Sequence, residues 1–195
     1  MRKLVFSMNV SLDGFADHEV ALADDELHDF ATRLLDTQDM VLFGRATYQL
    51  FESYWPSAPK DPQATKSMIA FARKINAMPK VVFSKTLPGA SWNNTKLVRG
   101  DAVEELLKLK KEDGKDLAVG GISLIQTFLN RGLIDEYWLL VQPLIWGQGR
   151  RLFAGVTGRS EQRLLDVATF KSGVVVLHCM PERKETGKGK DAEQS

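Results

Sequence analysis

The sequence contains very little cysteine and histidine. Cys179 is the only cysteine in the 195 residues, so an intramolecular disulfide bond is not possible. The histidines are His18, His28 and His178, and neither they nor Cys179 show the spacing of a zinc site or of a catalytic triad. We therefore expect no metal ion, and we interpret Cys179 as a thiol inside an apolar strand.

An excess of charge of one sign and long apolar runs are also missing. Lys plus Arg number 26 and Asp plus Glu number 25, which gives a formal net charge of +1. This near balance is a poor electrostatic match for nucleic acid or for an anionic membrane. No apolar run approaches the ~18 residues of a membrane-spanning helix, and the first apolar stretch is too short for a signal peptide. We expect a cytoplasmic protein with no nucleic-acid or membrane partner, in which any bound anion meets a few local cations.

Length and composition predict one globular domain. The chain is 44% hydrophobic and 26% charged, with 15 Gly and 7 Pro, as in ordinary globular proteins. Residues 182–195 carry four basic and four acidic side chains and no apolar one larger than Ala192. Such a segment buries too little surface to offset the entropy of ordering it. The sequence thus predicts a folded domain over residues 1–181 and a disordered charged tail over residues 182–195.

Short apolar runs alternate with stretches of helical period, which predicts an α/β fold. The predicted strands are residues 3–9, 39–43, 80–84, 95–98, 116–119, 135–143, 162–170 and 174–180. The predicted helices are residues 24–36, 46–54, 66–77, 101–111 and 122–130. Because no helix is expected after residue 133, the last three strands should join the sheet partly antiparallel.

Two predicted strands end in glycine and lead directly into a helix. The first is followed by Gly44, Arg45 and Thr47, and the second by Gly120-Gly121-Ile122-Ser123. Glycine lets a ligand approach the backbone, and the amides of a helix N-terminus favour an anion. Either junction could equally be a simple tight turn. Neither spacing matches the GxGxxG or Walker A motif, which argues against a Rossmann dehydrogenase and a P-loop ATPase.

A third strand end places two hydroxyl groups beside an ammonium group, in Ser84-Lys85-Thr86. This cluster could hold a terminal phosphate through charge-assisted hydrogen bonds, although a solvated loop explains it as well. Ligands of open α/β sheets collect at the carboxyl ends of strands. Three such junctions on one sheet therefore favour a ligand with several phosphates, such as a dinucleotide.

Polar side chains alternate at the end of the first predicted strand. Ser7, Asn9, Ser11 and Asp13 fall on one side of an extended segment that ends at Gly14. The Asp13-Gly14 pair could be no more than a turn. If these groups instead face a pocket, they orient a substrate, and Asp13 is the best-placed group to donate or relay a proton.

Taken in order, these segments resemble the dihydrofolate reductase-like superfamily. They are most similar to the reductase domain of the bifunctional riboflavin-biosynthesis deaminase-reductases, here in a stand-alone form without the deaminase half. The resemblance covers roughly residues 3–180 and rests on residues 11–14, 43–48, 80–84, 119–121, 133–137, 142–149 and 152–153. It implies a three-layer α/β/α domain with a mixed, mostly parallel central sheet and antiparallel C-terminal strands.

The resemblance also implies an NADPH-dependent oxidoreductase like the 5-amino-6-(5-phosphoribosylamino)uracil reductase of riboflavin biosynthesis, acting on a small-molecule substrate. The implied cofactor-binding residues are Gly44, Arg45, Thr47, Ser84, Lys85, Thr86, Gly120, Gly121, Ile122 and Ser123. The implied substrate side comprises Asp13 as the catalytic residue, with Asn9, Ser11 and Gly14 as binding residues. Trp55 lies in a segment that departs from the riboflavin pattern and could reshape the pocket, so we expect it to bind substrate as well. By the same resemblance the protein is expected to be a homodimer.

Two other functions stay open at this point. One is a dihydrofolate or pteridine reductase, in which Asp25 or Glu26 of the first helix would bind the pterin, although the spacing to Gly44 differs from that family. The other is a non-catalytic NADPH-binding protein.

Arg150 and Arg151 follow Gly149 and could meet a substrate phosphate, although a solvated turn explains them too.

Overall fold

The structure, a computed structural model, describes residues 1–182. Its strands are β1 (Leu4–Ser11), β2 (Gln38–Gly44), β3 (Lys80–Phe83), β4 (Thr95–Val98), β5 (Asp116–Gly120), β6 (Glu136–Gln142), β7 (Gln162–Thr169) and β8 (Val175–Pro181). Its α-helices are α1 (Asp25–Asp36), α2 (Arg45–Tyr54), α3 (Lys66–Ala77), α4 (Ala102–Leu109) and α5 (Ile122–Leu129). All of these elements were predicted from the sequence. Two short 3-10 helices, His18–Val20 and Ala58–Lys60, were not. Apart from residue 182, the predicted tail lies outside the described residues.

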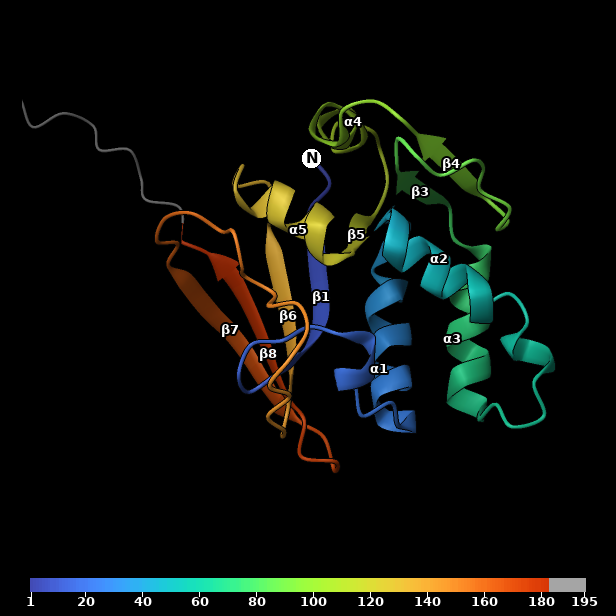
Figure 1. The fold of residues 1–195 in the computed structure, drawn as a ribbon, viewed down its shortest axis with the longest axis vertical. Helices are drawn as coiled ribbons and strands as arrows, with labels where there is room; N and C mark the ends of the chain where they lie inside the picture. Colours follow the sequence, from blue (N-terminus) through green and yellow to red (C-terminus); the bar gives the residue numbers. More distant parts are fainter. Residues whose placement is uncertain (183–195) are drawn as a thin grey trace, which may run out of the picture.

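The strands form one sheet in the order β4-β3-β2-β5-β1-β6-β8-β7 (Figure 1). Strands β1 to β6 are all parallel, whereas β8 runs antiparallel to β6 and to β7. The mixed sheet with antiparallel C-terminal strands is therefore confirmed. Because six strands are parallel, their carboxyl ends meet at one edge, where the three predicted anion-binding junctions lie.

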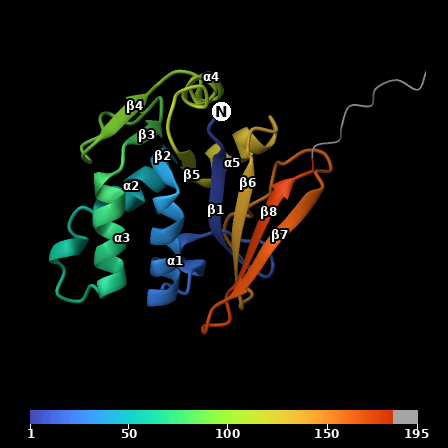
Figure 2. The same cartoon turned by 180° about the vertical axis from the view of Figure 1, so that it is seen from behind.

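Helices cover both faces of the sheet, and β2 shows how the sequence arranges this. Its Leu42 packs in a core with α4 and α5, whereas Val41 and Phe43 pack in a second core with α1, α2 and α3. Successive side chains of a strand point to opposite faces, so the continuous apolar run of β2 serves both layers. The three-layer α/β/α arrangement is confirmed, and Figure 2 shows α1 and α3 next to each other on one face of the sheet.

The helices differ in how they begin. The side chains of Asp24, Thr65 and Asp101 cap α1, α3 and α4 by accepting backbone N–H groups of the first turn. In contrast, α2 follows Gly44 and α5 follows Gly121, and neither glycine can offer a side-chain cap. The first-turn N–H groups of these two helices can therefore donate to water or to a ligand.

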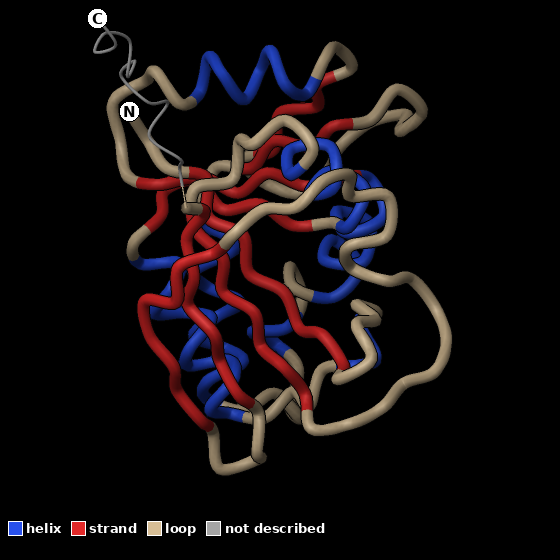
Figure 3. The backbone as a smooth tube through the Cα atoms, turned by 90° about the vertical axis from the view of Figure 1, so that its left-hand side faces the viewer, coloured by secondary structure: helices blue, strands red, loops and turns tan. Residues whose placement is uncertain are grey.

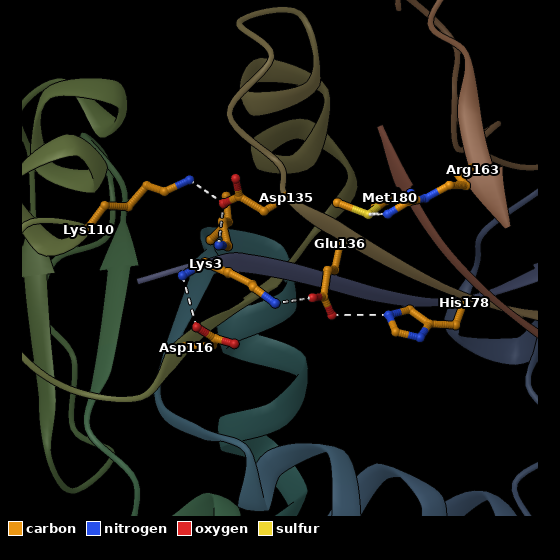
Figure 4. Close-up of polar contacts among 9 residues, drawn as sticks. Lys3, Lys110, Asp116, Asp135, Glu136, Arg163, His178 and Met180 are labelled. Carbon is orange, nitrogen blue, oxygen red and sulfur yellow. Dashed lines mark hydrogen bonds and ion pairs between the residues drawn. The ribbon is translucent and has the colours of Figure 1, made fainter. Parts of the chain in front are cut away.

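The amino edge of the sheet carries charges that are matched internally (Figure 4). Lys3 Nζ lies 2.6 Å from Glu136 Oε1, and Glu136 Oε2 lies 3.1 Å from His178 Nε2. Lys110 pairs with Asp135 at the same edge. These contacts tie β1, β6, β8 and the end of α4 together, so we interpret this edge as structural.

The far edge of the sheet is open. Every residue of β7 is exposed, including Leu164, Leu165 and Val167 at 55%, 41% and 48%. Viewed from this side, the strands lie in front and the long helices behind them (Figure 3). Among the described residues, no helix is long and apolar enough to cross a membrane.

Candidate functional site

The two glycine junctions lie side by side at the carboxyl edge. Strands β2 and β5 are neighbours, with Phe43 opposite Gly120. Gly121 adopts φ +107°, which side chains rarely allow, and a Cβ there would lie 2.9 Å from Thr47 Oγ1 and 3.3 Å from Gly44 N. Glycine at position 121 thus lets the starts of α2 and α5 approach each other. The structure brings the first two predicted anion sites together into one cradle, defined here as residues 44–47 and 120–123.

The third junction extends this cradle across β3. Gly44 pairs with Phe83, so Ser84 begins the loop directly beside the start of α2. The Arg45 guanidinium donates to Thr86 Oγ1 at 2.8 Å, and Ser84 Oγ accepts the backbone N–H of Thr86 at 3.2 Å. Among the described residues, neither Arg45 nor Lys85 forms an ion pair with a carboxylate. The cationic groups at the carboxyl edge are therefore available to an anionic ligand, whereas Lys3 and Lys110 at the amino edge are paired with carboxylates.

Two more arginines lie at this edge: Arg99, which was not predicted from the sequence, and Arg150. Arg99 follows β4, and its guanidinium donates to the backbone carbonyls of Lys85 at 3.1 Å and Leu87 at 2.8 Å, which holds the loop after β3 in place. Its place directly after a short strand was the available signal. Arg150, for which the sequence left a substrate-phosphate contact and a solvated turn open, donates to Ser123 Oγ at 2.8 Å and so lies at the start of α5.

The position of Arg150 has an electrostatic consequence. The N-terminus of a helix carries a partial positive charge, so a guanidinium there is unfavourable unless an anion lies between the two. Arg150 forms no ion pair among the described residues, and Ser123 is exposed beside it. The arrangement favours an anionic ligand at the start of α5.

Asp13 has a different environment from the one predicted. Its carboxylate accepts Ser11 Oγ–H at 2.6 Å and the backbone N–H groups of Trp146 at 3.0 Å and Gly147 at 2.8 Å. These hydrogen bonds, that of Ser11 first, lower the pKa of Asp13 to about 2. Asp13 is therefore ionised at neutral pH and is a poor proton donor. Its contacts anchor the loop after β6 to the end of β1.

Ser11 and Gly14 form the turn that follows β1. Ser11 is buried, and its hydroxyl group donates to Asp13 and accepts the Phe15 N–H at 3.0 Å. Gly14 has φ +86° and donates its N–H to the Ser11 carbonyl. These contacts give both residues a structural role in the turn, and their contact with substrate stays a prediction. Asn9, by contrast, is half-buried on β1 and keeps free hydrogen-bonding capacity.

Trp55 lies in the helical layer of the fold. It follows α2 at the end away from the cradle, and its ring packs against Phe71 of α3 at a centroid distance of 4.6 Å and against His28 of α1 at 5.9 Å. Its carbonyl accepts the side-chain amide of Asn76. The structure thus places Trp55 among the helices α1, α2 and α3, because the apolar ring joins that core; its contact with substrate stays a prediction.

The fold and the two-helix cradle define a class of α/β protein with two uncapped helix N-termini at the carboxyl edge of its parallel strands. Residues 2–176 match the RibD C-terminal domain, so the chain belongs to this family. It is 34% identical to the uncharacterized protein YyaP of Bacillus subtilis over 180 residues, covering 90% of this chain and 93% of that protein. A second uncharacterized protein of the same organism, YwjB, is 26% identical over 180 residues, covering 89% of this chain and 95% of that protein.

Solved structures share the fold. A putative riboflavin biosynthesis protein from Shewanella sp. PV-4 has a TM-score of 0.69 and 22% identity, covering 94% of this chain and 100% of that chain. A diaminohydroxyphosphoribosylaminopyrimidine deaminase/5-amino-6-(5-phosphoribosylamino)uracil reductase from Thermotoga maritima has a TM-score of 0.64 and 16% identity, covering 92% of this chain and 56% of that one. These likenesses confirm the dihydrofolate reductase-like fold predicted from the sequence.

Proposed function

We propose that this protein is an NADPH-dependent reductase of a small pyrimidine or related heterocycle, similar to 5-amino-6-(5-phosphoribosylamino)uracil reductase. Membership of the RibD C-terminal domain family and the fold shared with a protein of that name support this proposal. The observation that carries it is the cradle, where two helices start without side-chain caps beside the guanidinium of Arg45, which has no carboxylate partner among the described residues.

The residues present fit a phosphorylated dinucleotide. Gly44, Gly121 and the first-turn amides of α2 and α5 supply backbone donors for a diphosphate, and Arg150 adds a charge at the same place. Arg45, Thr86 and Lys85 lie one strand further along and suit an additional phosphate on the ribose. A cationic fork at that position favours NADPH over NADH.

The substrate would lie next to the cradle, along the second half of β1. Strand β5 pairs with β1 only from Leu4 to Phe6 and then turns into Gly120, whereas β6 pairs with β1 as far as Ser11. The segment of β1 that contains Asn9 therefore has no strand partner on the side of the cradle. This unpaired segment borders the place where a nicotinamide and a substrate would meet.

In the proposed mechanism the protein holds NADPH and the substrate in position, and Asp13 does not donate the proton. A bound NADPH supplies the hydride. The cradle holds its phosphates, and Asn9 orients the substrate. Asp13 stays ionised and keeps the loop around Trp146 in place, so we assign the proton to a water molecule rather than to this carboxylate.

The structure offers no support for pterin binding through the first helix. Asp25 accepts the hydroxyl groups of Thr65 and Ser67, both at 2.5 Å, and Glu26 accepts the backbone N–H of Lys171 at 2.8 Å. Both carboxylates are occupied in joining elements of the fold. Pyrimidine reduction is therefore the function that we test first.

We also propose that two copies associate through β7. An exposed apolar edge strand is normally covered in soluble proteins, and an antiparallel pair of β7 strands would cover both edges. Arg163 and Asp166 pair with Met180 and His178 of β8, so both face the same side of the sheet. Antiparallel pairing about a two-fold axis would bring Arg163 of each copy toward Asp166 of the other.

Calorimetry and NADPH oxidation test the proposed function together. NADPH at ~100 times its dissociation constant should stabilise the protein by ~2.7 kcal/mol, and NADH should stabilise it less. With 5-amino-6-(5-phosphoribosylamino)uracil present, absorbance at the NADPH band should fall, and dihydrofolate should give no reaction. Stabilisation by NADPH without oxidation would instead support a non-catalytic NADPH-binding protein, and no stabilisation would refute the cofactor assignment.

A further inference from the structure

Gln142 is a buried polar residue that the proposed chemistry does not otherwise use. It is the last residue of β6, its side chain has 0% exposure, and it lies directly opposite Ser11 of β1. A buried amide without hydrogen-bond partners destabilises a fold, so we expect the side-chain amide of Gln142 to be hydrogen-bonded.

The orientation of the Gln142 amide is determined by two backbone groups. Its Oε1 accepts the backbone N–H of Leu22 at 3.0 Å, and its Nε2 lies 3.4 Å from the carbonyl oxygen of Leu140. A backbone N–H can only donate and a carbonyl oxygen can only accept. Turning the amide over would place two donors together at Leu22 and two acceptors together at Leu140. The Nε2 group of Gln142 must therefore be a donor on the side of β1.

This donor in turn determines the orientation of Asn9. Gln142 Nε2 donates to Asn9 Oδ1 at 2.8 Å. If the Asn9 amide were turned over, its NH2 group would face the NH2 group of Gln142. Asn9 Oδ1 is thus held toward β6, and Asn9 Nδ2 points away from it, with no hydrogen-bond partner among the described residues. Asn9 is half-buried, so this donor can still be reached.

We propose that Gln142 is a positioning residue that makes Asn9 present a hydrogen-bond donor to the substrate, and that the substrate meets it with an oxygen acceptor. For the proposed pyrimidine that acceptor is a ring carbonyl, not an exocyclic amino group. This inference rests on the proposed function, because it places the substrate along the unpaired segment of β1. Backbone atoms of Leu22 and Leu140 fix the Gln142 amide, and Gln142 fixes the Asn9 amide. The Asn9 amide therefore does not have to reorient when the substrate binds.

The orientation can be measured on the full chain without any ligand. In a 15N-labelled protein, the side-chain NH2 signals of the two residues are assigned from their absence in Asn9→Asp and Gln142→Met. The Gln142 NH2 protons should exchange with solvent at least tenfold more slowly than those of Asn9 and show an NOE to β1. Protected Asn9 protons, or equal exchange of both groups, would overturn the inference, whatever the protein reduces.

The effect on the substrate is measured with NADPH and 5-amino-6-(5-phosphoribosylamino)uracil. Asn9→Asp keeps the acceptor toward Gln142 but replaces the outward donor by an acceptor, so KM should rise at least tenfold. Gln142→Glu, assayed at a pH where the new carboxyl group is ionised, can no longer donate to Asn9, so the Asn9 amide turns over and KM should rise similarly although no substrate-facing side chain has changed. Both variants should keep the Kd for NADPH within twofold.

Gln142→Met separates positioning from packing. It keeps the shape of the side chain but releases Asn9, so KM should rise less than in Gln142→Glu while kcat stays within twofold. Equal KM values in all variants and the wild type would refute the positioning role. If the wild type binds NADPH but does not reduce the pyrimidine, the proposed substrate is wrong, and the exchange measurement alone decides the orientation of Asn9.

Discussion

Replacing Gly121 by alanine tests the geometry of the cradle. Gly121 holds φ +107°, and an added Cβ would lie 2.9 Å from Thr47 Oγ1 and 3.3 Å from the backbone nitrogen of Gly44. The first contact can be relieved by rotating Thr47, whereas the second requires the starts of α2 and α5 to separate. The substitution therefore strains the backbone and widens the anion site in the same step.

The expected magnitude follows from the backbone conformation. A non-glycine residue in a sparsely populated region costs on the order of 1–3 kcal/mol. For a domain of this size, about 2 kcal/mol lowers Tm by roughly 4–8 °C. Because the cradle amides also move relative to each other, we expect the Kd for NADPH to rise at least tenfold in Gly121→Ala.

Gly132→Ala is the matched control. Gly132 also has a positive φ of +62°, but a Cβ there meets no atom within 4 Å and the residue follows the far end of α5. It should lose about 1 kcal/mol of stability with unchanged affinity for NADPH. Thermal unfolding and isothermal titration calorimetry measure both effects. An unchanged Kd in Gly121→Ala, or the same loss in both variants, would refute the close approach of α2 and α5 as the basis of the site.

Three further predictions follow from other parts of the molecule. Asp13→Asn should raise KM but leave the alkaline limb of the kcat–pH profile unchanged, because the Asp13 pKa of about 2 leaves this carboxylate without a proton to donate between pH 5 and 8; loss of that limb would restore Asp13 as the acid. Burial lowers the pKa of Lys80 from 10.5 to about 8, so the unfolded chain binds this proton more tightly and stability should rise by about 2 kcal/mol from pH 7 to 9.5. Urea unfolding should show no such contribution in Lys80→Met, and identical pH profiles would contradict the assignment. Leu164→Glu should convert a dimer to a monomer in sedimentation velocity, whereas a wild-type monomer would refute the β7 interface.

The fold was predictable because its elements carry local signals. Apolar runs located the strands, helical periodicity and capping residues such as Asp101 located the α-helices, and the absence of helices after residue 133 indicated the antiparallel end of the sheet. The 3-10 helix Ala58–Lys60 was missed because its three residues carry no period. The carboxyl-edge cradle was predictable because glycine at a strand end followed by a helix has a direct physical meaning.

The substrate side was less predictable because its roles depend on contacts between distant segments. Alternation placed Asn9, Ser11 and Asp13 together, but only the structure shows that Ser11 and Asp13 are used within the turn and toward Trp146. Trp55 was assigned from its place in an unusual segment, whereas its neighbours in space are His28 and Phe71. Pairing across more than a hundred residues leaves no trace in local spacing.

The central claim is that Arg45 and its neighbours hold the additional phosphate of NADPH. Titration calorimetry of Arg45→Ala with both dinucleotides tests it most directly, because the Arg45 guanidinium contacts Thr86 in the loop after β3, where we propose that this phosphate binds. The account predicts that the wild type binds NADPH more tightly than NADH, and that Arg45→Ala weakens NADPH at least tenfold while changing NADH less than twofold. Equal loss for both dinucleotides, or a wild type that does not distinguish them, would contradict it.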